Sequence, residues 1–248
     1  MHTAAAVSPS SHLRTAPLAP VAPAGDRIAE ALRLVRDAVP IVRRSCQAGD
    51  RLHAAGDPFV HLHIVHAGVF KVVAGSADGR EQVTGLQFKG DWLGFDGIAT
   101  GRHATDTFAM DTGEVWAVRY DDLLQASARA PALARLVHAA MSRELARDRD
   151  HLLSVCTLPA DARVAGFLQQ WAMALDERGL RNDQITLRLT RAEIGASLGM
   201  QLETVSRALS RLAREGLIAF CGTGRREIHI PDPGALALAA SPARGTLQ

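Results

Sequence analysis

The 248-residue sequence predicts an α+β protein built from an N-terminal antiparallel β-roll (a small cupin-like barrel), a long helix and a C-terminal winged helix-turn-helix. Between residues 46 and 120, short β-rich runs are separated by Gly and Asp turn signals about every ten residues, the cadence of a small antiparallel barrel or sandwich. A helical segment of about 28 residues follows, over 131–158. Residues 190–216 then read as helix, glycine turn and helix.

The composition is that of an ordinary globular chain, with 47% hydrophobic and 22% charged residues. The formal net charge is only +2, so any nucleic-acid signal has to be local. No apolar run reaches the ~18 residues that span a bilayer, so we expect no membrane contact. The cysteines lack any ligand spacing, which argues against a cysteine-ligated metal site and a disulfide framework; they are Cys46, Cys156 and Cys221.

Five segments are expected along the chain. The N-terminal stretch is rich in Ala, Pro and Ser, and its prolines interrupt every apolar run that a signal peptide would need, so we expect a disordered tail and a cytoplasmic protein. Short helices are expected near 26–39 and at 121–129, a longer one at 160–178 and a strand at 184–190. The expected boundaries are 1–25 for the disordered tail, 26–130 for the β-roll sensor domain, 131–158 for a dimerisation helix, 159–236 for the winged helix-turn-helix domain and 237–248 for a flexible tail.

The long helix carries a heptad pattern that is typical of a two-helix dimer seam. The alternative is a helix packed against its own roll. In a symmetric pair Asp148 would face its own copy, and the like charges would oppose dimerisation, so we expect a weak or regulated homodimer. The predicted seam contains Ala134, His138, Met141, Leu145, Asp148, Leu152 and Val155.

The segment at 190–216 contains the signals of a helix-turn-helix. Thr190 and Glu193 form a capping box that starts the first helix, and Gly199 supplies the left-handed residue that the turn requires. The second helix begins near Leu202, although Gln201 before it is not a preferred capping residue. Its predicted buried stripe consists of Val205, Ala208, Leu209 and Leu212.

The opposite face of the second helix predicts DNA recognition in the major groove. Arg207 can donate two hydrogen bonds to guanine, and Glu203 can accept one from cytosine. Arg207, Arg211 and Arg214 stack like charges, which costs stability unless an anion lies over them. Residues 186–230 hold seven Arg and four Glu, a net charge of +3. The residues expected to contact DNA, from this helix and from a wing around Gly222–Gly224, are Glu203, Thr204, Ser206, Arg207, Arg211, Arg191, Arg225 and Arg226.

With roll, long helix and winged helix-turn-helix in this order, the chain resembles the Crp-Fnr family of transcription regulators over roughly residues 26–235. The runs GDRLHAAGD and HIVHAGVFKVV look like the family's first barrel strands, and GDWLGFDGIATGRH looks like the fumarate-nitrate branch. The run ETVSR resembles that branch's recognition signature, carried here by Glu203, Ser206 and Arg207. The resemblance implies a homodimer that binds TTGA-like half-sites in an inverted repeat, RNA polymerase as a partner, and control of genes for low-oxygen or nitrogen-oxide metabolism.

Two departures from the family pattern concern the input signal. The stretch that corresponds to the cyclic-nucleotide cassette differs from it, so we expect no cyclic AMP at this candidate effector pocket, which consists of Gly94, Phe95, Asp96, Arg102 and His103. The branch's [4Fe–4S] cluster is excluded, because the N-terminal tail has no cysteine and Trp116 stands at the place of the barrel cysteine.

Other inputs stay open. His61, His63 and His66 invite a haem or metal interpretation, but ordinary half-exposed strand residues explain them as well, and we assign no metal site. Cys156 is either a redox switch or a small buried hydrophobe, and Cys221 is open in the same way. A haem- or small-molecule-dependent regulator is the alternative function. An enzyme is disfavoured, since the chain has no G-x-S-x-G, H-E-x-x-H or P-loop motif.

Overall fold

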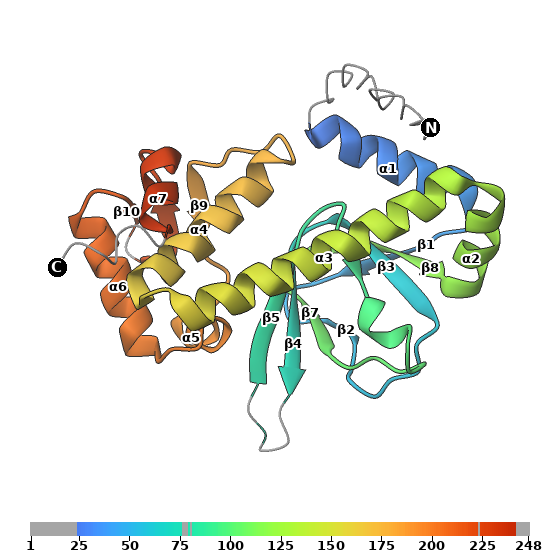
Figure 1. The fold of residues 1–248 in the computed structure, drawn as a ribbon, viewed down its shortest axis with the longest axis horizontal. Helices are drawn as coiled ribbons and strands as arrows, with labels where there is room; N and C mark the ends of the chain where they lie inside the picture. Colours follow the sequence, from blue (N-terminus) through green and yellow to red (C-terminus); the bar gives the residue numbers. More distant parts are fainter. Residues whose placement is uncertain (1–23, 76–78, 80, 223, 242–248) are drawn as a thin grey trace, which may run out of the picture.

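The computed structural model describes residues 24–75, 79, 81–222 and 224–241 (Figure 1). The predicted N-terminal tail lies outside the described residues, except that Ala24 and Gly25 already belong to the first helix. Most of the predicted C-terminal tail lies outside them as well. No helix among the described residues is long and apolar enough to cross a membrane.

In the part of the chain that the structure describes, eight strands form two antiparallel sheets that face each other as a roll rather than as a closed barrel. The first sheet has the order β1-β8-β3-β6 and the second the order β2-β7-β4-β5. The strands, and the 3₁₀ turn η1, are β1 (Val42–Cys46), β2 (Arg51–His53), β3 (His61–Ala67), β4 (Phe70–Gly75), β5 (Glu81–Gln87), β6 (Trp92–Leu93), η1 (Phe95–Gly97), β7 (Asp106–Ala109) and β8 (Gly113–Arg119). The buried residues between the sheets are Cys46, Leu52, Val65, Phe70, Leu93, Ala109 and Val115.

One predicted turn shows why glycine is required there. Gly68, between β3 and β4, has a φ of +84°, which disfavours a side chain. A Cβ at this position would also lie 2.8 Å from Cα of Gly113, at the start of β8. Because the two backbones approach so closely, only glycine fits at position 68.

Three helices complete the N-terminal half: α1 (Ala24–Ala38), α2 (Tyr120–Arg129) and α3 (Pro131–Thr157). They agree with the helices predicted from periodicity to within two residues at each end. Leu133 and Ala140 of α3 are buried with α1, α2 and the first sheet. Helix α3 crosses the roll and runs on to the C-terminal domain, as Figure 1 shows. Beyond Ala140 it still contacts the roll, since Arg147 lies 3.3 Å from Asp91, but Leu145 and Leu152 are more than half exposed.

The C-terminal domain consists of α4 (Ala160–Asp176), β9 (Gln184–Thr186), α5 (Arg191–Leu198), α6 (Leu202–Arg214), β10 (Ala219–Cys221), β11 (Glu227–His229) and α7 (Pro233–Ala239). Its three-stranded antiparallel sheet has the order β10-β11-β9, which confirms the expected wing. The strand predicted at 184–190 ends earlier, at Thr186.

The last described helix runs past residue 236, the predicted end of the C-terminal domain. Helix α7 continues to Ala239, and its Leu236 and Ala239 are buried in the core of the C-terminal domain. Asp232 caps this helix by accepting hydrogen bonds from the backbone of Gly234 and Ala235. An Ala-rich segment of seven residues has too little periodicity to indicate burial from sequence alone.

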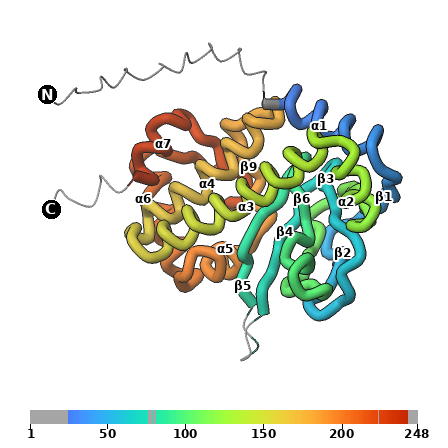
Figure 2. The backbone as a smooth tube through the Cα atoms, turned by 45° about the vertical axis from the view of Figure 1, so that its right-hand side comes forward, coloured from blue at the N-terminus to red at the C-terminus, as the bar shows by residue number. Residues whose placement is uncertain are grey.

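The two domains share a hydrophobic core. Phe88, which follows β5, packs edge-to-face on Trp171 of α4 with ring centroids 5.8 Å apart. Helix α5 lies beside β5, as Figure 2 shows. Three ion pairs between described residues cross the same boundary: Lys71 of β4 contacts Glu193 of α5, Asp111 contacts Arg188 at 3.1 Å, and Asp91 contacts Arg178 at 2.9 Å.

Candidate nucleic-acid interface

The predicted turn between α5 and α6 is present in detail. Thr190 accepts a hydrogen bond from the backbone of Glu193, and the Glu193 carboxylate accepts from the backbone of Thr190, which completes the capping box. Gly199 ends α5 with a φ of +63°. Burial alone would raise the pKa of Glu193, but hydrogen bonds from Lys71 and Thr190 outweigh it and hold the pKa below its ordinary value. The contact between Lys71 and Glu193 thus joins the first turn of the helix-turn-helix to the roll.

Helix α6 has the two faces that the sequence predicts. Val205, Ala208, Leu209 and Leu212 are all at most 2% exposed. On the other side Glu203 and Arg207 are exposed, and no ion pair joins these two described residues. Both side chains are therefore available to base edges in a major groove.

Two smaller predicted contact residues lie beside them. Thr204 and Ser206 are half-buried on α6. Ser206 accepts a hydrogen bond at its carbonyl from the hydroxyl of Ser210, over 2.9 Å. Gln201 caps α6 without a side-chain hydrogen bond, in agreement with its low preference for this position.

The environment of Arg211 differs from what the sequence predicts, because its positive charge is neutralised within the protein and not by a bound anion. Its Nε donates to Oδ2 of Asp161 over 2.7 Å, and its Nη2 contacts the other carboxylate oxygen. This hydrogen-bonded pair raises the pKa of Arg211. The anion over this part of the stack is a side chain of α4, fifty residues away in the chain, so Arg211 is already paired without DNA.

Arg225 and Arg226 are exposed cations of the wing. Arg225 adopts a φ of +49°, and its guanidinium lies 4.4 Å from the ring centre of Phe220. Arg191 of α5 donates to the carbonyl of Arg225 over 2.7 Å. Burial lowers the pKa of Arg191, and the charges of Arg225 and Arg226 lower it further. Arg191 thus links α5 to the wing, while Arg225 and Arg226 face outward.

Comparisons with known proteins agree with this geometry. A family model described as a Crp-like helix-turn-helix domain matches residues 162–239, and one described as a cyclic nucleotide-binding domain matches residues 43–130. The fumarate nitrate reduction regulatory protein of Klebsiella oxytoca is 32% identical over 202 residues, which cover 82% of this chain and 80% of that protein. The chain belongs to the Crp-Fnr family of transcription regulators.

Other Crp-Fnr proteins extend the comparison. The fumarate and nitrate reduction regulatory protein of Escherichia coli (strain K12) is also 32% identical over 202 residues, with the same coverage. The solved structure of FixK2 from Bradyrhizobium japonicum superposes with a TM-score of 0.73 at 27% identity, over 82% of this chain and 98% of that one. A CRP-family regulator from Thermus thermophilus, at 21% identity and a TM-score of 0.64 over 79% and 96% of the two chains, shares the fold. This Crp-Fnr protein is therefore a DNA-binding transcription regulator.

The predicted seam of the Crp-Fnr protein divides into two parts. Leu145, Asp148 and Leu152 are exposed, and Met141 is half-buried. Val155 instead packs within the chain, because its Cγ1 lies against Gly199 of the helix-turn-helix turn. The end of α3 thus contacts the DNA-binding domain, while the middle of the seam is uncovered.

The residues of the predicted effector pocket are divided between two cavities, although Oδ1 of Asp96 lies 3.6 Å from Nδ1 of His103. A cavity of about 700 Å³ lies between the second sheet, α3 and α4, and Gly94 and Asp96 line it together with Glu144, His151 and Trp171. Phe95 stacks with Trp92 at 6.0 Å. Arg102 is exposed and donates to the carbonyl of Gly56 over 2.7 Å. His103 lines a different, smaller cavity.

The iron–sulfur cluster of the fumarate-nitrate branch does not fit the cysteines of this chain. Cys46 is 1% exposed in the core of the roll, and burial raises the pKa of its thiol. Cys156 lies near the end of α3, and Cys221 ends β10 in the wing. Three cysteines on three elements cannot supply the four thiolates that such a cluster takes.

The histidines of β3 have separate environments. The ring of His66 stacks on that of Trp116, with ring centroids 4.6 Å apart, and its Nδ1 lies 3.1 Å from the carboxylate of Glu114. His63 is buried, and burial lowers its pKa to about 3. His61 is half-buried and lies beside His63, with ring centroids 6.3 Å apart. Of the three, His63 alone is buried.

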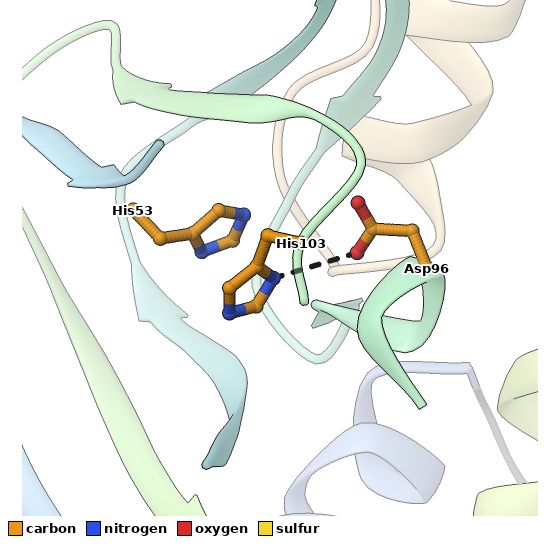
Figure 3. A group of neighbouring side chains, drawn as sticks. All are labelled: His53, Asp96 and His103. Atoms are coloured by element: carbon orange, nitrogen blue, oxygen red, sulfur yellow. Dashed lines mark ion pairs between the residues drawn. The ribbon is translucent and has the colours of Figure 1, made fainter. Parts of the chain in front are cut away.

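The sequence did not predict the neighbours of His63, although one of them, His103, was expected in the effector pocket. His53 of β2 and His103 stack with ring centroids 3.7 Å apart (Figure 3). The His53 ring also lies 6.0 Å from that of His63. Burial, followed by the charge of His103, lowers the pKa of His53 to about 4. The Nδ1 atoms of all three histidines are buried without a hydrogen bond to any described residue, an arrangement that costs about 1–3 kcal/mol for each atom. No local spacing signals this cluster, because its members come from different strands and loops.

Proposed function

We propose that this protein binds, as a homodimer, an inverted repeat of TTGA-like half-sites and regulates transcription of genes for low-oxygen or nitrogen-oxide metabolism. The observation that carries the proposal is the pair of exposed side chains Glu203 and Arg207, one turn apart on α6. A TTGA half-site contains a single G·C pair. Arg207 suits the guanine and Glu203 the cytosine amine of such a pair, and each contact is worth about 1–3 kcal/mol of discrimination.

The relatives support the choice of regulon. The proteins of Klebsiella oxytoca and Escherichia coli are named for fumarate and nitrate reduction. The run ETVSR on α6 resembles the recognition signature of the fumarate-nitrate branch, which favours the same class of operator. RNA polymerase is the expected partner at the promoters concerned.

The test is fluorescence anisotropy on a duplex carrying TTGAT-N4-ATCAA, with aerobically purified protein and fixed moderate salt. We expect tight binding that Arg207→Ala weakens by about tenfold to a hundredfold, with discrimination against a scrambled duplex lost. Arg214→Ala is the matched control, since this exposed arginine ends the same helix; its effect should be equal on both duplexes. Equal affinity of the unmodified protein for the two duplexes would refute the operator assignment.

The homodimer is proposed from the uncovered middle of α3. Leu145 and Leu152 are 56% and 63% exposed, and their spacing places them on one side of the helix. Two recognition helices of a symmetric pair would then enter successive major grooves about 34 Å apart. Sedimentation velocity tests this: Leu145→Asp should give monomers, whereas Leu238→Asp, at an exposed leucine of α7, should not. Dimers of unchanged strength with Leu145→Asp would contradict this seam.

A small-molecule-dependent regulator is the second candidate, and the cavity of about 700 Å³ favours it. His151 of α3 lines this cavity, and its buried Nε2 has no hydrogen-bond partner in the described part of the chain. An imidazole nitrogen of this kind can serve as an axial ligand of haem. The absorption spectrum of the purified protein tests whether haem is the ligand. A Soret band that the substitution His151→Asn removes supports haem binding. If no Soret band appears after haem is added, haem is ruled out.

A further inference from the structure

A group of side chains in the roll, away from the DNA-binding helix, has the composition of a metal site. His53 ends β2, Asp96 lies in η1, and His103 lies in the loop before β7. Figure 3 shows the three side chains converging from these separate elements. One ligand atom from each lies within 4.8 Å of the other two. This spacing is close to that of ligands around a single ion.

Hydrogen bonds from neighbouring residues hold two of the three side chains in place. Thr107, which is 1% exposed, bonds Nε2 of His53 over 3.0 Å and leaves Nδ1 of that ring unused. Asp96 accepts three hydrogen bonds at Oδ2, from the backbones of Ala104 and Thr105 and from the Thr105 hydroxyl, over 2.8–2.9 Å. Its Oδ1 remains, 3.6 Å from Nδ1 of His103. Such outer partners orient the ligands of metal sites.

The Nδ1 atoms of the cluster lack hydrogen-bond partners among the residues that the structure describes. His53, His63 and His103 are 7%, 8% and 5% exposed, and none of their Nδ1 atoms has a hydrogen bond there. The Nδ1 of His103 is too far from Asp96 for one. Buried polar atoms are normally satisfied, so three orphan nitrogens in one place indicate a bound species that accepts lone pairs.

An access route exists beside the cluster. A cavity of about 400 Å³ is lined by His53, His63 and His103 and reaches the surface at Arg44, Asp57 and His61. The guanidinium of Arg44 donates to the carbonyls of Leu52 and Arg51, so it is held at the rim. An ion and its remaining water ligands have room to enter here.

We propose that His53, His103 and Asp96 bind one divalent transition-metal ion, with His63 or water completing its coordination. Two imidazoles and a carboxylate suit Zn²⁺, Co²⁺, Ni²⁺ or Cu²⁺, whereas Mg²⁺ and Ca²⁺ take oxygen ligands. Because the rings of His53 and His103 lie within 9° of parallel, their lone pairs do not meet at one point. One ring therefore turns when the ion binds.

The experiment is titration of the untagged, chelator-treated full-length protein with Co²⁺, followed by visible absorption and equilibrium dialysis. We expect about one equivalent bound at the site, with the d–d bands of a nitrogen- and oxygen-ligated ion, displaced by Zn²⁺. The spectrum of the unmodified protein is a readout that needs no variant. No uptake above that of the buffer blank overturns the proposal.

Variants assign the ligands. His53→Gln and His103→Gln should each abolish the bands, whereas His66→Gln, on the same sheet as His63 but outside the cluster, should leave them intact. Thr107→Val keeps every ligand and should weaken Co²⁺ binding tenfold to a hundredfold. Circular dichroism checks that each variant is folded. Equal loss with His66→Gln, or unchanged bands in the folded double variant His53→Gln/His103→Gln, refutes the assignment.

Discussion

Arg178, just beyond the end of α4, donates a hydrogen bond from Nη2 to Oδ2 of Asp91, at the start of the roll's β6, over 2.9 Å. The two side chains are only 6% and 12% exposed. Asp91 also contacts Arg147 of α3 at 3.3 Å, so one carboxylate joins the roll, the long helix and the DNA-binding domain. This contact adds to the shared hydrophobic core that joins the DNA-binding domain to the roll.

The first prediction concerns that carboxylate. Asp91→Ala should lower the free energy of unfolding by about 3–5 kcal/mol, because it removes the only buried carboxylate that the described residues place beside the Arg178 charge and leaves the exposed Glu177 at 3.6 Å. Urea denaturation measures the loss. Asp37→Ala is the control, since Asp37 and Arg36 form an exposed pair of the kind that contributes at most about 1 kcal/mol. Similar small losses for both variants would show that the Asp91 contact does not hold the domains together.

The second prediction separates two arginines by their role. Arg211 is paired with Asp161, whereas Arg226 is exposed on the wing. Arg211→Ala should cost about 1 kcal/mol of stability and barely change the salt dependence of DNA binding. Arg226→Ala should leave stability unchanged and reduce the slope of log K against log salt by about one unit. A lower slope with Arg211→Ala would mean that Arg211 leaves Asp161 for a phosphate.

The third prediction is a pH dependence from Glu144 of α3. Burial, with Asp148, Asp96 and Asp91 adding to it and Arg147 opposing it, raises the pKa of Glu144 from 4.5 to about 7. The folded state therefore binds this proton more tightly than the unfolded state does. The resulting stability is complete below about pH 4.5 and is lost as the pH rises to about 7.

Glu144→Gln removes that loss. Relative to the Gln variant, the unmodified protein should lose at most about 3 kcal/mol of unfolding free energy between pH 4.5 and 7. Urea denaturation at pH 5 and pH 8 gives the difference. Glu30→Gln, at an exposed position of α1, controls for the substitution itself. A difference that stays constant with pH would disprove the raised pKa.

The fourth prediction concerns the tight turn of the helix-turn-helix. A Cβ at Gly195 would lie 2.5 Å from the carbonyl oxygen of Met200, a backbone atom that cannot move aside. Gly195→Ala should cost about 3 kcal/mol or more and abolish operator binding. Gly166→Ala in α4 has room for its methyl group, 3.8 Å from Ala240, and should be neutral or stabilising. Thermal melts and anisotropy check both; a stable, DNA-binding Gly195→Ala protein would contradict the turn geometry.

The fifth prediction concerns the charge in the proposed seam. Asp148 is exposed on α3, three residues beyond Leu145. Asp148→Ala should strengthen the homodimer, because two copies of the carboxylate would otherwise meet across a symmetric seam. Asp150→Ala, at a neighbouring exposed position off the heptad pattern, is the control. A sedimentation-derived dimer constant unchanged by Asp148→Ala would remove the idea of charge-weakened dimerisation.

The sequence by itself determined the local features of this protein. The Thr190–Glu193 capping box, the left-handed Gly199 and the two faces of α6 all follow from residues three to seven positions apart. Interactions at these spacings form within one helix or turn, whatever surrounds it. For the same reason the helices were predicted closely, and Glu203 and Arg207 could be recognised as a candidate pair for base contacts.

Tertiary structure alone decided which side chains meet across the fold. Asp161 balances Arg211, Asp91 receives Arg178, and His53 stacks on His103. These partners are fifty or more residues apart and come together only when sheets and helices pack, so no spacing in the chain announces them. Burial follows the same rule: α7 and the histidine cluster acquire their environments from neighbouring elements, which a one-dimensional pattern does not contain.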